Sequence, residues 1–111
     1  MAIETRDLKV NVSVTVIVPK DTWSAQELQQ AVENAVNSGK GSIVVNLSAV
    51  PELDGERAHA LDMADRHTAL MGGTLKLSNV ADDVVTALLV QRSSLLGRRF
   101  QNEAEAVLSF A

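Results

Sequence analysis

Cysteine is absent from the 111-residue chain, and aromatic residues are scarce: one tryptophan, two phenylalanines and no tyrosine. Without cysteine there can be no disulfide, no thiolate nucleophile and no cysteine-ligated zinc. Three aromatic side chains far apart in the sequence form no stacking platform for bases, and a net charge of -4 offers no basic surface for a phosphate backbone. We therefore expect no nucleic acid as a direct partner.

Long hydrophobic runs are absent as well. No stretch approaches the roughly 18 consecutive apolar residues that a membrane-spanning helix needs, and the first seven residues are polar rather than signal-like. Because the lack of cysteine also suits a reducing compartment, we expect a soluble cytoplasmic protein without direct membrane insertion. The length and the 46% hydrophobic content predict a single domain over residues 1–111.

The clearest pattern that is present is the alternation of apolar and mostly polar residues from Leu8 to Val18. A period of two predicts a strand whose even-numbered residues face a core. The run is longer than the usual strand of about 5–6 residues, so a bend or an internal hairpin is an alternative. Neither glycine nor proline marks a turn inside the run.

A helix and a buried strand are predicted next. Ser24-Ala25-Gln26-Glu27 has the sequence of a capping box, with Trp23 placed to pack on Leu28 as a hydrophobic staple. Gly39 stands where a helix commonly ends. The continuous apolar run Ile43-Val44-Val45 is typical of a central strand covered on both faces.

The rest of the chain continues to alternate between helix and strand. A second helix is predicted from Asp54 to Gly72-Gly73, with Met71 among its apolar positions, followed by a strand at residues 74–78. A third helix is predicted from Asp82 to Arg92, with acids in its first turn and a base in its last. Residues 98–100 are expected to form a short edge strand, and a capping box at residues 102–105 to open a last helix. The order predicts an α/β fold: a mixed four- or five-stranded sheet with four helices.

The predicted second helix carries five titratable residues that raise the question of a metal site: Glu56, His59, Asp62, Asp65 and His67. A metal site usually needs three or four converging ligands, and His67 lies two turns beyond His59. We therefore interpret this helix face as solvated and charged, and we interpret Arg92, Arg98 and Arg99 as a solvated basic rim. No metal or cofactor is expected.

Catalysis is not expected either. His59 could form an acid–base pair with Asp54 or Glu56, but neither a nucleophile nor an oxyanion donor can be assigned beside it.

The segment from Ser42 to Asp54, Ser-Ile-Val-Val-Asn-Leu-Ser-Ala-Val-Pro-Glu-Leu-Asp, resembles the most recognisable part of the STAS domain, the fold of bacterial anti-sigma factor antagonists. In that family a hydrophobic strand leads through a pattern like D-L-S-x-V-x-x-I/M-D-S-S-G into a helix. The likeness continues in one register through residues 71–80, similar to G-G/A-x-L-x-L-x-x-V, and through residues 102–107, similar to an E-x-A-L ending. It implies a βαβαβα layout and a protein-binding, regulatory role.

The resemblance also implies a switch that this chain has lost. In the family, the serine or threonine directly after the aspartate is phosphorylated by a partner kinase of the GHKL type that is also the anti-sigma factor. The phosphate adds roughly -1.5 to -2 charges at a helix N-terminus and releases the partner. Here Asp54 fills the aspartate position, but Gly55 stands at the acceptor and Glu56 and Arg57 follow. The loop has no hydroxyl at the usual site.

Two residues near this loop each have two interpretations. Glu56 interacts with the helix dipole, for about 0.3 to 1 kcal/mol, or it is a fixed, weaker imitation of the phosphorylated state, and the two are compatible. Trp23 is the staple described above or an exposed anchor for a partner. It belongs to a first loop, Val18 to Trp23, where the family often has G-x-L-D instead.

The resemblance implies an interaction surface built from these two loops. Its residues are Asp21, Thr22, Trp23, Asp54, Gly55, Glu56, Arg57 and His59. The expected partner is an anti-sigma factor of the GHKL kinase type; the alternative is that the chain serves as an accessory or scaffold subunit of a transporter or of a stressosome-like assembly. A homodimer is compatible with the sequence, and a regulatory hydroxyl at Ser48, Thr68 or Ser78 remains open.

Overall fold

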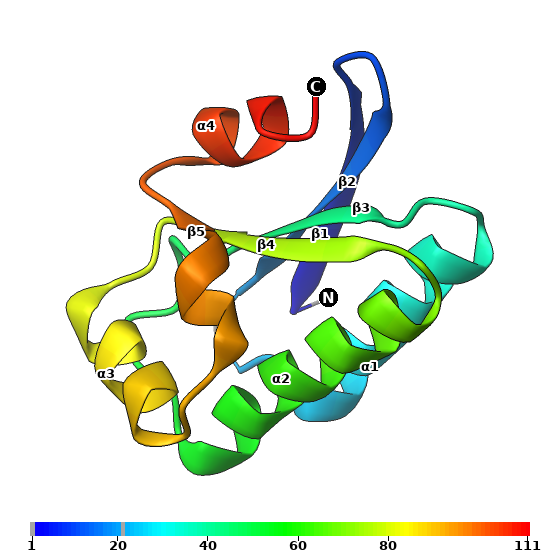
Figure 1. Ribbon diagram of the computed structural model, residues 1–111. Coiled ribbons are helices and arrows are strands. Elements are labelled where there is room, and N and C mark those ends of the chain that lie inside the picture. Colours follow the sequence, from blue (N-terminus) through cyan, green and yellow to red (C-terminus); the bar gives the residue numbers. More distant parts are fainter. Residues whose placement is uncertain (1, 21) are drawn as a thin grey trace.

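The computed structural model describes residues 2–20 and 22–111, and in this part of the chain five strands form one mixed sheet in the order β1-β2-β3-β4-β5. Four α-helices and one 3-10 helix complete it, which confirms the predicted α/β fold (Figure 1). The elements are β1 Ile3–Lys9, β2 Ser13–Pro19, α1 Ala25–Asn37, β3 Ser42–Asn46, α2 Gly55–Leu70, β4 Thr74–Ser78, α3 Asp82–Val90, the 3-10 helix η1 Ser94–Arg98, β5 Arg99–Phe100 and α4 Glu103–Leu108.

The alternating run from Leu8 to Val18 is not one strand, and the hairpin alternative is confirmed. β1 pairs with β2 in antiparallel register from Ile3 opposite Pro19 to Lys9 opposite Ser13. The turn between them contains Asn11 at a φ of 113°. Asparagine adopts positive φ more readily than most residues, so the chain turns without glycine or proline.

Burial follows the predicted face only in the second half of the run. Val14 and Val16 are fully buried, whereas Leu8 and Val12 are 36% and 41% exposed. Ile17, on the opposite face of β2, is also fully buried. Val10 is partly buried and packs against the cluster that contains Val14 and Val16. The prediction of one buried face was therefore wrong for Leu8 and Val12 and incomplete for β2, which lies inside the sheet and is covered on both sides.

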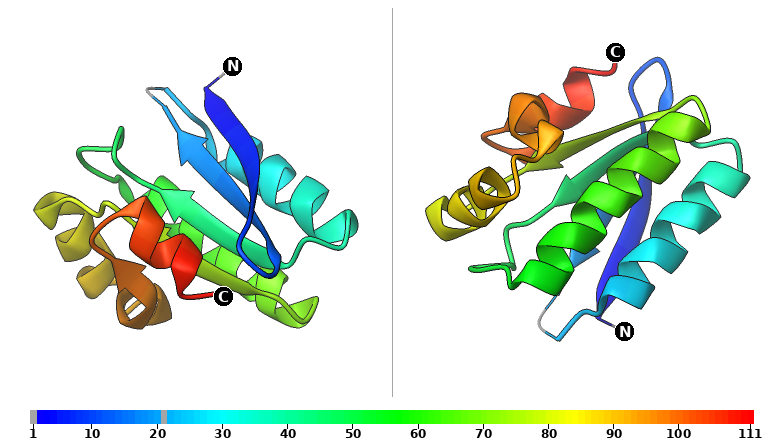
Figure 2. Two further views of the ribbon diagram at one scale, coloured as in Figure 1. Left: turned by 90° about the horizontal axis from the view of Figure 1, so that it is seen from above. Right: turned by 60° about the horizontal axis from the view of Figure 1, so that its bottom comes forward.

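The sheet separates two apolar clusters of unequal size. The predicted adjacency of β2 and β3 is confirmed, and β2, β3, β4 and β5 pair in parallel. α1 and α2 lie side by side under one face, while α4 lies on the other (Figure 2). Ile43 and Val45 belong to the larger cluster, and Val44 belongs to the smaller one with Ala106 and Val107 of α4. The prediction that β3 is covered on both faces is confirmed.

Most of the helix ends predicted from the sequence are confirmed. Ser24 and Glu27 form both hydrogen bonds of the capping box of α1, and Gly39 follows its C-terminus at a φ of 77°. Three details were wrong. Of the capping box predicted at residues 102–105, only one half forms: Asn102 accepts a hydrogen bond from the main-chain N–H of Glu105. Met71 is not an apolar position inside α2: it follows the helix and is 58% exposed. Arg92 is not in the last turn of α3, which ends at Val90.

Candidate functional site

The β2–α1 and β3–α2 connections are joined by one side chain, that of Arg57. Arg57 lies in the first turn of α2 and donates a hydrogen bond from Nε to the main-chain oxygen of Trp23 over 2.9 Å. Its guanidinium carbon lies 5.4 Å from the centre of the Trp23 ring, a cation–π distance. The two loops that the sequence predicted to share a surface are therefore in contact.

The Trp23 side chain is buried beneath this surface and packs in the core. It is only 2% exposed, and it belongs to the same apolar cluster as Leu28. The staple interpretation agrees with this burial, and the exposed-anchor interpretation does not. An indole ring that is already buried offers a partner no surface to insert into a pocket.

The start of α2 has the capping that the sequence predicted. Asp54 precedes the helix, and its Oδ1 accepts a hydrogen bond from the main-chain N–H of Arg57 over 2.8 Å. The second oxygen of Asp54 lies 3.8 Å from Nη1 of Arg57, with the Asp54 side chain 61% exposed. Glu56 is exposed in the first turn, where a carboxylate is favourably placed toward the helix dipole.

Gly55 occupies the first helical position, and nothing in its surroundings requires glycine. A Cβ built there meets no atom within 4 Å, and its φ is not positive. A serine or threonine would fit the same backbone. Packing therefore does not exclude a hydroxyl-bearing side chain at position 55. The loop lacks the hydroxyl only because the sequence has glycine there.

Two further residues of the predicted surface can be placed. Thr22 and His59 are exposed, and Thr22 has a φ of 66°, which is uncommon for a β-branched residue. Asp21 lies outside the described residues. Beside the loop, a groove of about 360 Å³ runs between α1 and α2, and both Glu56 and His59 contribute to its lining.

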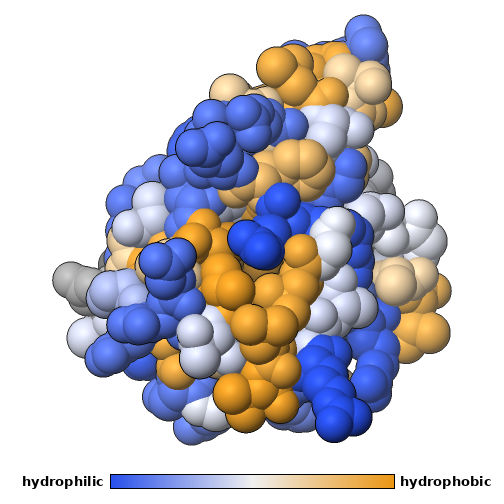
Figure 3. All heavy atoms as spheres, turned by 60° about the vertical axis from the view of Figure 1, so that its left-hand side comes forward, coloured by the Kyte–Doolittle hydropathy of each residue, from blue (hydrophilic) through white to orange (hydrophobic). Residues whose placement is uncertain are grey.

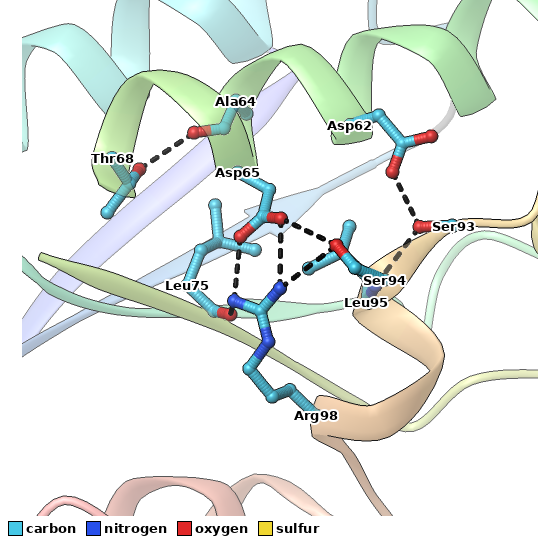
Figure 4. A network of polar contacts seen from close by, with 9 residues as sticks. All are labelled: Asp62, Ala64, Asp65, Thr68, Leu75, Ser93, Ser94, Leu95 and Arg98. Carbon is cyan, nitrogen blue, oxygen red and sulfur yellow. Dashed lines mark hydrogen bonds and ion pairs between the residues drawn. The ribbon is translucent and has the colours of Figure 1, made fainter. Parts of the chain in front are cut away.

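Of the three other hydroxyls considered, only one is accessible. Ser48 is exposed, whereas Thr68 and Ser78 are fully buried. Thr68 donates its hydroxyl to the main-chain oxygen of Ala64 over 2.8 Å (Figure 4). A kinase could reach Thr68 or Ser78 only after local unfolding.

The prediction of a solvated, charged face on α2 holds for Glu56 and His59, which are exposed, and is wrong for Asp65. Asp65 is 8% exposed and forms a two-pronged ion pair with Arg98, with distances of 2.7 and 2.9 Å (Figure 4). Arg98 also donates to the main-chain oxygen of Leu75 and is therefore not part of a solvated rim. The Asp65 carboxylate raises the pKa of Arg98 above its ordinary value.

Asp62 is engaged as well. It accepts a hydrogen bond from the hydroxyl of Ser93 over 2.5 Å and another from the amide of Gln91. Neither network was foreseen, because its members are about thirty residues apart in the sequence. Among the described residues, no group of three or more histidine and acidic side chains converges as a metal site, and none of the helices has the length and apolarity to cross a bilayer.

Apolar side chains gather on the side of the molecule where α3 lies (Figure 3). Leu89 and Val90 of α3 are 58% and 81% exposed. This exposed apolar surface on α3 was not predicted from the sequence.

Solved structures with the same fold come from different kinds of protein, among them two bacterial proteins and an anion transporter. A serine-to-glutamate variant of RsbS from Moorella thermoacetica is 21% identical, with 91% of each chain covered and a TM-score of 0.74. The Bacillus cell fate determinant SpoIIAA in its phosphorylated form is 16% identical over 97% of this chain and 100% of that chain, with a TM-score of 0.70. The murine anion transporter Slc26a9 is 15% identical over 96% of this chain but only 22% of its own, with a TM-score of 0.65.

These identities are low, so the likeness concerns the fold. No curated protein sequence matches the chain significantly. The model of the STAS domain, however, matches residues 2–106, nearly the whole chain and every element described above except the end of α4. The chain therefore belongs to the STAS domain family.

Proposed function

We propose that this chain is a cytoplasmic protein-binding regulatory domain of the anti-sigma factor antagonist type, without catalysis of its own and without a phosphorylation switch at the usual position. The protein-binding role rests on the STAS family match over residues 2–106, and the absence of a switch rests on Gly55. It is exposed, it directly follows the helix-capping Asp54, and it stands in open space at the family's acceptor position.

The proposed partner surface is the one that Arg57 holds together. Its exposed members are Thr22, Asp54, Gly55, Glu56 and His59. Trp23 serves as its buried support, and Asp21 belongs to it on sequence grounds. The partner we propose is an anti-sigma factor of the GHKL kinase type, since SpoIIAA, of the same fold, is an anti-sigma factor antagonist.

Glu56 gives this surface a fixed negative charge one residue after the lost acceptor. Phosphorylation works by adding charge at a helix N-terminus. The permanent carboxylate of Glu56 also adds negative charge at this helix N-terminus, although less than a phosphate adds. We therefore propose a constant affinity for the partner, in place of a switched one.

A second candidate is an accessory or scaffold subunit, and the same Gly55 favours it. A domain that does not cycle between phosphorylated and free forms suits a permanent assembly. The fold also occurs in a stressosome structure, at 20% identity, and in the Slc26a9 transporter.

The test is affinity capture from the native host with a tagged chain and two charge-reversed variants. Glu56→Lys alters the proposed surface, and Glu105→Lys is the matched control, because it reverses an exposed acid in the first turn of α4 on the other face of the sheet. We expect the wild type and Glu105→Lys to recover the same amount of partner, and Glu56→Lys to recover more, because it removes the charge that imitates the releasing phosphate. A GHKL-type kinase among the captured proteins supports the first candidate, and a transporter or scaffold subunit supports the second. Equal recovery by both variants would contradict the proposed surface.

A further inference from the structure

The sheet ends differently at its two edges. β5 is only two residues long, whereas β1 has seven residues and pairs over its whole length with β2. In the part of the chain that the structure describes, no strand lies beyond β1 (Figure 2). An edge strand that is long, regular and free of proline presents unpaired main-chain groups to other chains.

The main-chain groups at this free edge can be identified. The N–H of Lys20 donates to the oxygen of Ala2 over 2.6 Å, one pair beyond Ile3 opposite Pro19. Residues that exchange hydrogen bonds alternate along an antiparallel pair. Even-numbered residues of β1 therefore bond to β2, and Ile3, Thr5 and Asp7 point their N–H and C=O groups outward.

Two of the four charged side chains of β1 are held over the faces of the sheet, away from this edge. Arg6 is held over one face of the sheet by Glu103 of α4, with distances of 2.7 and 2.8 Å. Asp7 is held over the other face by Lys40 and Thr15 at 2.6 and 2.9 Å. A groove of about 360 Å³ between β1 and α1 leaves room for the side chains of an added strand.

We propose that β1 is a self-association edge, at which a second copy of this chain adds its own β1 in antiparallel orientation, centred on Thr5. A two-fold axis perpendicular to the sheet passes midway between one residue of the strand and the same residue of the second copy. If the axis lay at Glu4, Arg6 or Asp7, that charged residue would face the same residue of the second copy. An axis at Leu8 would pair only residues 7–9.

Centring on Thr5 places Glu4 opposite Arg6 of the second copy, twice by symmetry. In this register Thr5 exchanges hydrogen bonds with Thr5 of the second copy, and Ile3 exchanges them with Asp7 of the second copy. Every outward N–H and C=O group from residue 3 to residue 7 is then hydrogen-bonded. The interface is small, so we expect a weak, reversible dimer. The inference does not rest on the proposed function, because it is argued from the main-chain groups and charges of β1 alone.

The test is sedimentation equilibrium of the full chain up to about 1 mM, where even a millimolar dissociation constant is detected. Thr5→Pro removes the central outward N–H, which the β1–β2 ladder does not use, and a proline is tolerated in that position of an edge strand. Thr5→Val is the matched control, because it keeps the N–H. We expect the wild type and Thr5→Val to form a dimer and Thr5→Pro to remain a folded monomer.

A second variant and a second readout keep the test decisive if Thr5→Pro does not fold. Glu4→Lys faces Arg6 of the second copy and should weaken the dimer at least tenfold. In the wild type, amide exchange of Thr5 and Asp7 should slow as the protein concentration rises. A monomeric wild type, a folded Thr5→Pro that still dimerises, or a Glu4→Lys with undiminished association would each overturn the proposal.

Discussion

At the scale of single residues, Arg57 connects the two loops of the candidate surface. It is the residue that touches both loops, through the main-chain oxygen and the ring of Trp23. Its own N–H is capped by Asp54. Replacing it with glycine, as a family-like loop would have it, would therefore remove a structural contact along with a surface charge.

We predict that Arg57→Ala lowers the free energy of unfolding by about 1 to 2 kcal/mol, through loss of a hydrogen bond and a cation–π contact. Trp23 is the only tryptophan, so its fluorescence emission should shift in the same variant. Urea unfolding followed by fluorescence measures both. Arg66→Ala, at an exposed position of the same helix, is the control and should change neither quantity. An Arg57→Ala protein with unchanged stability and emission would show that the two loops hold their positions without this contact.

At the scale of elements, Asp65 and Arg98 connect α2, η1 and β4. Asp65 lies on α2, Arg98 ends η1, and the guanidinium also reaches the main-chain oxygen of Leu75 on β4. The Asp65 side chain is 12% exposed and that of Arg98 is 30% exposed. A largely buried pair of this kind is costly to break on one side only, because the remaining charge has no partner.

We predict that Arg98→Leu lowers the free energy of unfolding by about 3 kcal/mol. The double variant Asp65→Leu with Arg98→Leu should be more stable than Arg98→Leu alone, because it removes the uncompensated carboxylate as well. Urea unfolding of the wild type, both single variants and the double variant gives the coupling directly. Additive effects of the two substitutions would rule out the ion pair as the reason for the loss.

The attachment of α4 to the sheet should depend on pH. The hydrogen bond from Arg6, with that from Asn46, lowers the pKa of Glu103 below its ordinary value of 4.5. A carboxyl group with a lowered pKa stabilises the fold fully above its ordinary value, and the contribution is lost as the pH falls through the folded value. Asp7, whose pKa is lowered by Lys40 and Thr15, acts in the same direction.

We therefore predict that the unfolding free energy falls below about pH 4.5, and that Glu103→Gln makes this fall less steep. Equilibrium unfolding between pH 3 and pH 7 measures the slope. The Glu105→Lys variant, altered in the same helix turn but away from Arg6, should retain the wild-type slope. A Glu103→Gln protein with the wild-type slope would assign the acid sensitivity to other carboxyl groups.

At the scale of the whole molecule, the sequence predicted what depends on neighbours along the chain. The caps at Ser24 and Asp54, the glycine after α1 and the continuous run of β3 are local signals, and the structure has them in place. The sequence indicates the hairpin only as an alternative, because its turn uses Asn11 in place of glycine or proline.

What the sequence could not predict depends on contacts across the fold. Arg57 is 34 residues from Trp23, and Arg98 is 33 from Asp65, so no periodicity within a helix or strand connects either pair. Only the packing of α2 against the first loop and against η1 brings these groups together. The interpretation of Asp65 and Arg98 as solvated failed for this reason.

Whether this domain has a phosphorylation switch is tested by the intact mass of the protein after incubation with ATP and a GHKL-type kinase that phosphorylates a STAS protein under the same conditions. We expect no phosphate on residues 54–57 of the wild type. We expect one phosphate at position 55 of Gly55→Ser, because a side chain there meets open space and serine is acceptable at a helix start. Peptide mapping locates the modification, including any at the exposed Ser48. A wild-type protein that is phosphorylated and thereby loses its partner would contradict the claim that this domain has no phosphorylation switch.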